Sequence, residues 1–311
     1  MLRALFVTVA LLAGAASAQP ADWSRAAPLP TARSEMRAAV WGGRIYVPGG
    51  LGRFGSLGAF EVYDPAADAW RTLPELPVPV HHAGVAAAEG RIFVAGGYRD
   101  LTFRPDHAAL FAFDVAVERW HRLADLPAAR AGHALVALDG TLYVIGGVGP
   151  SAQRVLRYDL ATGRWRAPAA DLPTPREHLD AVVLDGRIWA IGGRWRSGNL
   201  ATVEVYDPAA DVWTSAPDLP TPRSGLAAAV VDGRVHVVGG EALDSSRTFA
   251  AHEVYDPALE RWERWDEMIP GRHGLAAASA DGALYVIGGA TRAGAGTFVS
   301  LSALTARWGP R

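Results

Sequence analysis

Carboxylate and imidazole side chains stand at corresponding places in an otherwise repetitive chain. Glu177 is followed directly by His178, and Asp180 lies two residues further along. Such a pair can exchange protons with a bound molecule, because imidazole changes its charge near neutral pH. The corresponding positions of other repeats hold different residues with related chemistry: Glu35, His82 and His273. Packing alone would be satisfied by one residue type in every repeat, so this variation favours a site. The alternative is that these positions are exposed to solvent and that their residues vary by sequence drift, without a function.

Arginine stands just before these positions in five repeats. The column consists of Arg33, Arg130, Arg176, Arg223 and Arg272. A guanidinium can hold a carboxylate or a phosphate through two parallel hydrogen bonds. A variable loop adds Arg194-Trp195-Arg196, whose indole could stack on a sugar or anchor a partner, or pack on its own unit. We predict that the column, Arg194 and Trp195 contact a ligand.

Composition excludes several classes of function. The net charge of −2 argues against a general nucleic-acid binder. The chain has no Cys, so disulfides, thiolate nucleophiles and Cys-ligated metals are excluded. No recognisable metal-ligand spacing joins His82, His178 and Asp180. The sequence therefore predicts neither a metal nor a cofactor.

Residues 1–18 have the pattern of a secretory signal peptide. Arg3 supplies the positive charge, an apolar run follows, and Ala16-Ser17-Ala18 matches a cleavage site. The apolar run is too short for a stable membrane anchor, and no later segment is long and apolar enough to span a bilayer. We predict cleavage before Gln19, export to the periplasm or the extracellular space, and a single domain over residues 19–311. A retained N-terminal anchor is the alternative.

A repeat of nearly constant length accounts for the rest of the chain. Gly-Gly pairs end six apolar runs, at Gly49, Gly96, Gly146, Gly192, Gly239 and Gly288, with spacings of 47, 50, 46, 47 and 49 residues. Before each pair, two apolar runs flank a two-residue turn, such as Asp139-Gly140. Asp-Gly is typical of a type I′ turn, which needs positive φ at both central residues. The pattern predicts six hairpins of a first and a second strand.

A third and a fourth strand follow in each repeat. An aromatic residue in the third strand precedes a Trp by seven residues, as in Tyr63 and Trp70, and Asp-Pro and Leu-Pro mark the turns between strands. Gly-Gly, Tyr-Asp-Pro, Trp and Leu-Pro-x-Pro-Arg in this order resemble the kelch repeat, over essentially residues 23–308. The resemblance implies an all-β, six-bladed β-propeller of four-stranded antiparallel blades. It also implies that the column arginines can tie neighbouring blades together. By the same resemblance, Glu35, His82, Glu177, His178 and His273 face the central pocket.

Closure of the ring is ambiguous. Trp23 lies seven residues before Pro30, as Trp70 does before Pro77, so it reads as a fourth strand that completes the last blade from the N-terminus. Trp308, seven residues after Leu301, fits the same strand from the C-terminus. We predict closure by the N-terminal strand, with C-terminal closure as the alternative.

The longer connections of such a propeller gather at one face, and loops on a rigid scaffold commonly carry function. Many arginines occur in these connections, whereas acidic residues collect in the short turns of the other face. We therefore predict a binding protein for an anionic small molecule, a glycan or a protein partner. The alternative is a sugar enzyme, because exported kelch propellers include N-acetylneuraminate epimerases (mutarotases). In that case Glu35, Glu177 and His178 are the candidate catalytic residues. Oligomeric state is left open.

Overall fold

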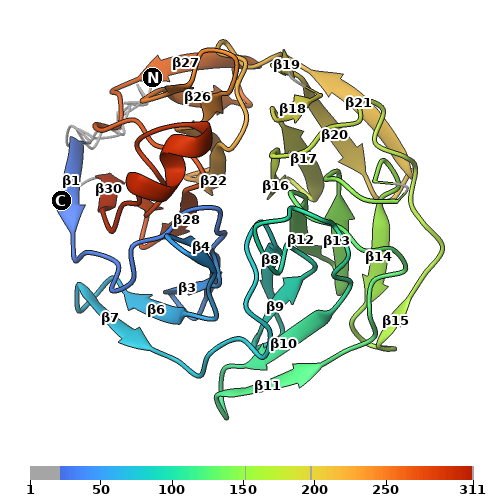
Figure 1. Ribbon diagram of the computed structural model, residues 1–311. Coiled ribbons are helices and arrows are strands. Elements are labelled where there is room, and N and C mark those ends of the chain that lie inside the picture. The colour runs from blue at the N-terminus through green and yellow to red at the C-terminus, as the bar shows by residue number, and fades with distance from the viewer. Residues whose placement is uncertain (1–21, 151, 197, 310–311) are drawn as a thin grey trace, which may run out of the picture.

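Six four-stranded antiparallel sheets stand around a central axis (Figure 1) in the computed structural model, which describes residues 22–150, 152–196 and 198–309. Blade one contains β2 (Ala39–Trp41), β3 (Arg44–Pro48), β6 (Phe60–Asp64) and β7 (Ala69–Thr72). Blade two contains β8 (Gly84–Ala88), β9 (Arg91–Ala95), β10 (Leu110–Asp114) and β11 (Arg119–Arg122). Blade three contains β12 (Ala134–Leu138), β13 (Thr141–Ile145), β14 (Leu156–Asp159) and β15 (Arg164–Trp165).

The second half of the chain continues the ring. Blade four contains β16 (Asp180–Leu184), β17 (Arg187–Ile191), β20 (Val203–Asp207) and β21 (Val212–Ala216). Blade five contains β22 (Ala227–Val231), β23 (Arg234–Val238), β26 (His252–Asp256) and β27 (Arg261–Trp265). Blade six contains β28 (Ala276–Ala280), β29 (Ala283–Ile287), β30 (Thr305–Gly309) and β1 (Asp22–Ala26). The predicted six-bladed propeller is confirmed.

Short elements follow the second strands of four blades. Three are two-stranded hairpins: β4 (Leu51–Gly52) with β5 (Gly55–Ser56), β18 (Arg194–Trp195) with β19 (Gly198–Asn199), and β24 (Glu241–Ala242) with β25 (Arg247–Thr248). In blade six, the 3₁₀ helix η1 (Gly294–Val299) replaces the hairpin. These connections bring side chains to the mouth of the propeller.

The predicted turns have the backbone geometry that their residues favour. Asp139 and Gly140 have φ angles of 47° and 70°, as a type I′ turn requires. Gly49, the first glycine of a Gly-Gly pair, has φ +66°, and a Cβ there would lie 2.7 Å from the carbonyl oxygen of Val80. Glycine is thus needed for both the conformation and the close approach of the next blade's chain.

The hydrophobic core lies between neighbouring blades. Each of its six clusters draws buried residues from two adjacent sheets. The Tyr–Trp pairs belong to this packing: Tyr63 and Trp70 are register partners with ring centroids 5.0 Å apart. Trp70 Nε1 donates to the carbonyl oxygen of Ala27 at 2.8 Å, and Tyr63 Oη donates to Asp68 at 2.6 Å. The fourth-strand Trp therefore fastens its blade to the preceding connection, whereas the Tyr holds the turn of its own blade, and both rings fill space between blades.

The N-terminal strand closes the ring, as predicted. β1 is the outermost strand of blade six and pairs with β30, with Trp23 opposite Trp308 (Figure 1). The interpretation of Trp308 as a fourth-strand residue is wrong. Trp308 lies in the third strand, between Leu284 and Trp23, where the other blades have Tyr or Phe.

The described residues contain no helix of the length and hydrophobicity that crossing a membrane would need. The predicted signal peptide, residues 1–18, lies outside the described residues, so its cleavage and the predicted export stay predictions.

Candidate functional site

A ring of six residues, one from each blade, surrounds the axis at the mouth. Each residue precedes the first strand of its blade and has a left-handed backbone, with φ between 50° and 64°. Three are glycines and three carry functional groups; in chain order they are Glu35, His82, Gly132, His178, Gly225 and Gly274. Consecutive members are joined by amide-to-carbonyl hydrogen bonds of 2.9 Å, as from His82 to Glu35, and the circle closes from Met36 N to Gly274 O at 3.5 Å.

Left-handed backbone is strained for residues with a Cβ, by about 1–2 kcal/mol. Gly132, Gly225 and Gly274 meet the conformation without cost, whereas Glu35, His82 and His178 do not. The glycines also leave room: a Cβ at Gly274 would lie 2.6 Å from Glu35 Oε1. Strained non-glycine residues are concentrated at functional sites.

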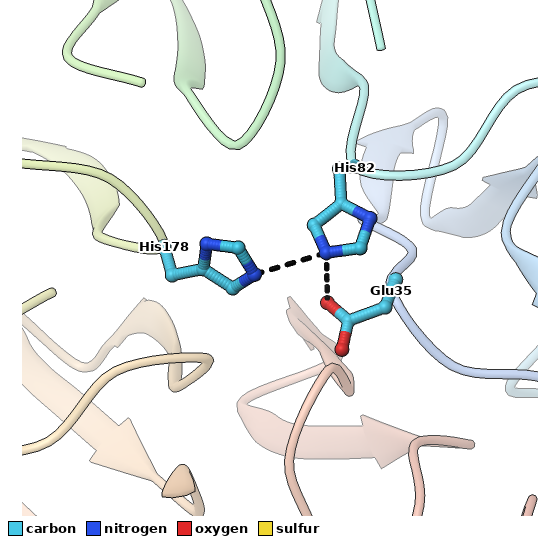
Figure 2. A group of neighbouring side chains, drawn as sticks. All are labelled: Glu35, His82 and His178. Atoms are coloured by element: carbon cyan, nitrogen blue, oxygen red, sulfur yellow. Dashed lines mark hydrogen bonds and ion pairs between the residues drawn. The ribbon is translucent and has the colours of Figure 1, made fainter. Parts of the chain in front are cut away.

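The three strained residues point toward one another across the axis (Figure 2). His82 Nε2 lies 3.1 Å from Glu35 Oε2 and 2.9 Å from His178 Nε2. These residues come from blades one, two and four and are nearly buried. The propeller thus brings together groups that are up to 143 residues apart in the chain (178 − 35).

A second set of charged groups adjoins this cluster. The residue before each ring position forms a bridge with the residue after the Gly-Gly pair, for example Glu177 with Arg194. Glu177 Oε2 lies 2.5 Å from His178 Nδ1, and its other oxygen accepts from Arg194 Nε at 2.6 Å. Arg194 Nη1 donates to Glu241 Oε1 at 2.8 Å, and Nη2 lies 3.1 Å from His178 Nε2.

His273 completes the arrangement from blade six. Its Nδ1 lies 3.3 Å from both Glu35 Oε1 and Glu241 Oε2. Its Nε2 is within hydrogen-bonding distance of the Arg292 carbonyl and the Thr297 hydroxyl. The imidazole therefore links the Glu35 carboxylate to the Glu241 carboxylate.

Burial and neighbouring charges set the protonation of these groups. Burial would raise the pKa of Glu177, but the charge and hydrogen bond of His178 and the Arg194 guanidinium outweigh it and hold the pKa at about 2. Burial lowers the pKa of His82 well below its usual value, although the Glu35 charge opposes this. Burial would also lower the pKa of His273, but the hydrogen bond and charge of Glu35 raise it. Near neutral pH the site thus holds carboxylates beside a neutral imidazole.

A pocket of about 280 Å³ lies over this cluster. Its charged and imidazole lining consists of Glu35, His82, His178, Arg194, Glu241 and His273. Phe103, Leu243 and Phe298 supply apolar walls, and η1 forms one side. The pocket therefore combines a polar floor with an apolar rim, as small-ligand sites do.

Arg37 closes the axis below the ring. Its guanidinium donates to the carbonyl oxygens of Leu179 at 2.6 Å and Leu226 at 3.0 Å, and it pairs with Asp180 at 3.2 Å. A separate cavity of about 460 Å³ lies on the other side of Arg37. Asp180 thus belongs to the Arg37 contact rather than to the His82 and His178 cluster.

The column arginines occupy a different environment from the one predicted. All five are at most 1% exposed, and none lines the pocket over the ring: Arg33, Arg130, Arg176, Arg223 and Arg272. Arg33 Nε donates to Gly49 O at 2.6 Å and the guanidinium pairs with Glu61 at 2.5 Å, while Arg176 pairs with Glu204 at 2.5 Å. Their burial argues against direct ligand contact. Arg33, Arg176 and Arg223 each tie the connection before a blade to the second and third strands of that same blade, rather than to a neighbouring blade as the resemblance implied.

The structure brings most of the other predicted residues together at the mouth and leaves Trp195 outside the pocket lining. It gathers Glu35, His82, Glu177, His178 and His273 at the mouth, together with Arg194. Trp195 is 42% exposed in the β18–β19 hairpin and is not among the pocket-lining residues. Sequence reasoning missed Glu241, which directly follows a Gly-Gly pair as Arg194 does. The signal that could have identified Glu241 is the charged residue that directly follows the Gly-Gly pair in blades four and five.

The ring also contains one group of potential metal ligands among the described residues. One ligand atom each of Glu35, His82 and His178 lies within 4.8 Å of the others. Two imidazoles and a carboxylate are a common donor set for transition metals. The sequence predicted no metal, because these residues share no local spacing.

Comparison with known proteins agrees with this architecture. A family model described as the KLHDC2/KLHL20/DRC7 Kelch-repeats domain matches residues 16–147 and 107–289. The chain belongs to the kelch-repeat family. Kelch-like protein 33 of Homo sapiens is 37% identical over 76 residues, which are 24% of this chain and 14% of that protein. Alpha-scruin of Limulus polyphemus is 38% identical over 80 residues, 25% of this chain and 9% of that protein.

These kelch relatives share only a small part of their length with this chain. A solved structure, that of YjhT, matches over 89% of this chain and 95% of its own, with a TM-score of 0.76 and 18% identity. At that identity the likeness establishes a common fold. What the mouth of this propeller binds has to be argued from its own residues.

Proposed function

We propose that this kelch propeller binds a small, neutral polyhydroxylated ligand of the sugar class in the pocket over the ring. The observation that carries the proposal is the convergence of carboxylates and imidazoles from different blades on the floor of one pocket. These groups can accept and donate hydrogen bonds to several hydroxyls at once. The volume, about 280 Å³, is close to the lower end of small-ligand pockets, roughly 300–1,000 Å³.

The charges on the floor argue against the anionic ligand that the sequence suggested. Glu177 and Glu241 both bind Arg194, so this guanidinium is already neutralised. Glu35 adds a further carboxylate beside His82. An anion in the pocket would meet the carboxylates of Glu35 and Glu241 and would compete for the Arg194 guanidinium, which is already paired. A neutral ligand avoids this repulsion.

Sugar mutarotation is the second candidate function. It needs a general base and a general acid at the anomeric hydroxyl and the ring oxygen. The 3.1 Å contact of Glu35 with His82, and the 2.5 Å contact of His178 with Glu177, supply two carboxylate–imidazole pairs. Glu35, His82 and His178 line the pocket, and Glu177 supports His178 from outside the lining. The protein would then bind a cyclic sugar and exchange its anomers.

A ligand screen followed by an anomer assay tests both candidates. Thermal shifts of residues 19–311 are measured with neutral monosaccharides and, separately, with N-acetylneuraminate. We expect a neutral sugar to raise the melting temperature of the wild type and to have a much smaller effect on Glu241→Gln. Polarimetry with that sugar then measures the anomerisation rate, which Glu177→Gln should lower if the protein is a mutarotase.

Two results would refute the proposal. A rise in melting temperature with N-acetylneuraminate alone would support an anionic ligand instead. A rise with a neutral sugar that is equally large in Glu241→Gln would indicate that the sugar binds outside this pocket. Trp195→Ala is the matched control, because this loop residue does not line the pocket. It should bind the neutral sugar like the wild type.

Export is a separate proposal, supported by the sequence pattern of residues 1–18. The N-terminus of the purified protein, read after expression of the full chain, should begin at Gln19. Recovery of the intact N-terminus in the cytoplasm would contradict it.

A further inference from the structure

We propose that Glu35, His82 and His178 form a binding site for a divalent transition-metal ion of the zinc type, whose open side faces the pocket. Three potential ligand atoms from three blades meet at one point. His82 Nε2 is 2.9 Å from His178 Nε2 and 3.1 Å from Glu35 Oε2. Ligands about 2.0–2.1 Å from a tetrahedral ion lie roughly 3.3 Å apart. The two distances to His82 Nε2 are close to this value, and all three ligand atoms lie within 4.8 Å of one another.

The hydrogen bonds behind the two imidazoles fix which nitrogens carry protons. His178 Nδ1 lies 2.5 Å from the Glu177 carboxylate, which only accepts, so Nδ1 is the protonated nitrogen. Arg194 Nη2 donates toward Nε2 at 3.1 Å, so Nε2 is the acceptor and carries a bare lone pair. This carboxylate–histidine pairing is the usual outer contact of a metal-bound histidine.

A similar relay orients His82. The Asp100 carbonyl oxygen accepts from His81 Nε2 at 3.2 Å, so His81 Nδ1 is bare in the neutral ring. His81 Nδ1 is in short contact with His82 Nδ1, which must therefore carry the proton. His82 Nε2 is left as a second bare lone pair.

Two imidazole lone pairs and a carboxylate oxygen thus face one another. A cation placed among the three atoms removes their mutual repulsion. The surroundings also favour a cation, because Glu177 and Glu241 already neutralise Arg194. Of the two Glu35 oxygens, Oε1 contacts His273, whereas Oε2 faces His82 and is the one available to an ion. Arg194 Nη2, 3.1 Å from His178 Nε2, donates to this point and must withdraw when the ion binds.

The donor set selects the class of metal. Imidazole nitrogens suit zinc, cobalt, nickel and copper, whereas magnesium and calcium prefer oxygen donors alone. Three protein ligands with an open fourth position match metal sites that accept water or a ligand hydroxyl. The open side here is the pocket, lined by Glu35, His82 and His178 from below.

The test uses untagged protein of residues 19–311, stripped with chelator and titrated with Zn²⁺ by calorimetry. Co²⁺ loading provides a visible spectrum that reports imidazole coordination. The variants are His82→Gly and His178→Gly, because glycine occupies the same left-handed position in three other blades and preserves the backbone. His121→Ala, an exposed histidine of β11, is the matched control.

We expect one Zn²⁺ per chain in the wild type and in His121→Ala, and at least about 100-fold weaker binding in each glycine variant. Glu177→Gln should weaken binding by about 10–100-fold, as outer-shell changes do. Zn²⁺ binding that is undetectable in the wild type, or equal in wild type and glycine variants, would overturn the site. Circular dichroism of each variant verifies folding, so that a loss of binding is assigned to the ligands. The readout needs no sugar and is independent of the proposed function.

Discussion

Replacing His178 by glycine and by alanine should separate the backbone strain of the ring from the loss of its side chain. Both substitutions remove the imidazole and its contacts with Glu177, His82 and Arg194. They differ only in the Cβ, which the wild-type residue already carries at φ 51°. The comparison therefore isolates the energy of a left-handed backbone.

The expected difference follows from two opposing terms. A Cβ in the left-handed region costs about 1–2 kcal/mol. Glycine is disfavoured through the greater entropy of the unfolded chain by about 0.4–1 kcal/mol. The first term is larger, so His178→Gly should be more stable than His178→Ala by about 1 kcal/mol, the reverse of the usual order.

Urea unfolding at neutral pH measures this difference directly, with equal m-values for the two variants as the condition for comparison. The same order is expected at His82, where φ is 56°, and at Glu35, where it is 50°. Ala131→Gly, one residue before the ring glycine of blade three, is the control and should lose stability. An alanine variant as stable as its glycine counterpart at all three ring positions would refute the strain argument.

Two further predictions concern buried ionisable groups that do not line the pocket over the ring. Burial lowers the pKa of His133 and of His236 to about 3 and that of His252 to about 4, whereas the pKa of histidine in the unfolded chain is about 6.5. Below pH 6.5 the unfolded chain therefore binds more protons than the folded protein, and the folded protein loses stability as the pH falls. The free energy of unfolding should fall by about 1.4 kcal/mol per pH unit for each imidazole between pH 6 and pH 5, and a flat urea-unfolding profile would contradict this. Arg176→Met leaves the Glu204 carboxylate buried without its cationic partner and should lower the free energy of unfolding by about 3–5 kcal/mol in the same assay. Sugar binding should be retained at a temperature where the variant is folded. Normal stability together with lost sugar binding would instead indicate that Arg176 contacts the ligand.

The architecture was predictable because its signals are local and repeated. The two residues Asp139-Gly140 are sufficient to predict a turn. The eight-residue segment from Tyr63 to Trp70 is sufficient to predict a pair of strands. The alternative placement of Trp308 in the fourth strand arose because its distance from Leu301 imitates that spacing. In the structure Leu301 makes only an isolated bridge, and the partner of Trp308 is Trp23, at the other end of the chain.

The site was predictable only in part, because its contacts depend on the closure of the ring. Glu35, His82 and His178 could be selected as variable positions in a fixed column. Their convergence depends on blades one, two and four meeting across the axis. Arg176 looked equally suitable by residue type, and only its partner Glu204, 28 residues away in the chain, shows that it packs inside the fold.

A crystal structure with the sugar that the thermal screen selects would test the central claim most directly. The account predicts ligand density on the axis, with hydroxyls within hydrogen-bonding distance of Glu35, His82 or His178. Density at any other place on the propeller, with this ring unoccupied, would contradict it.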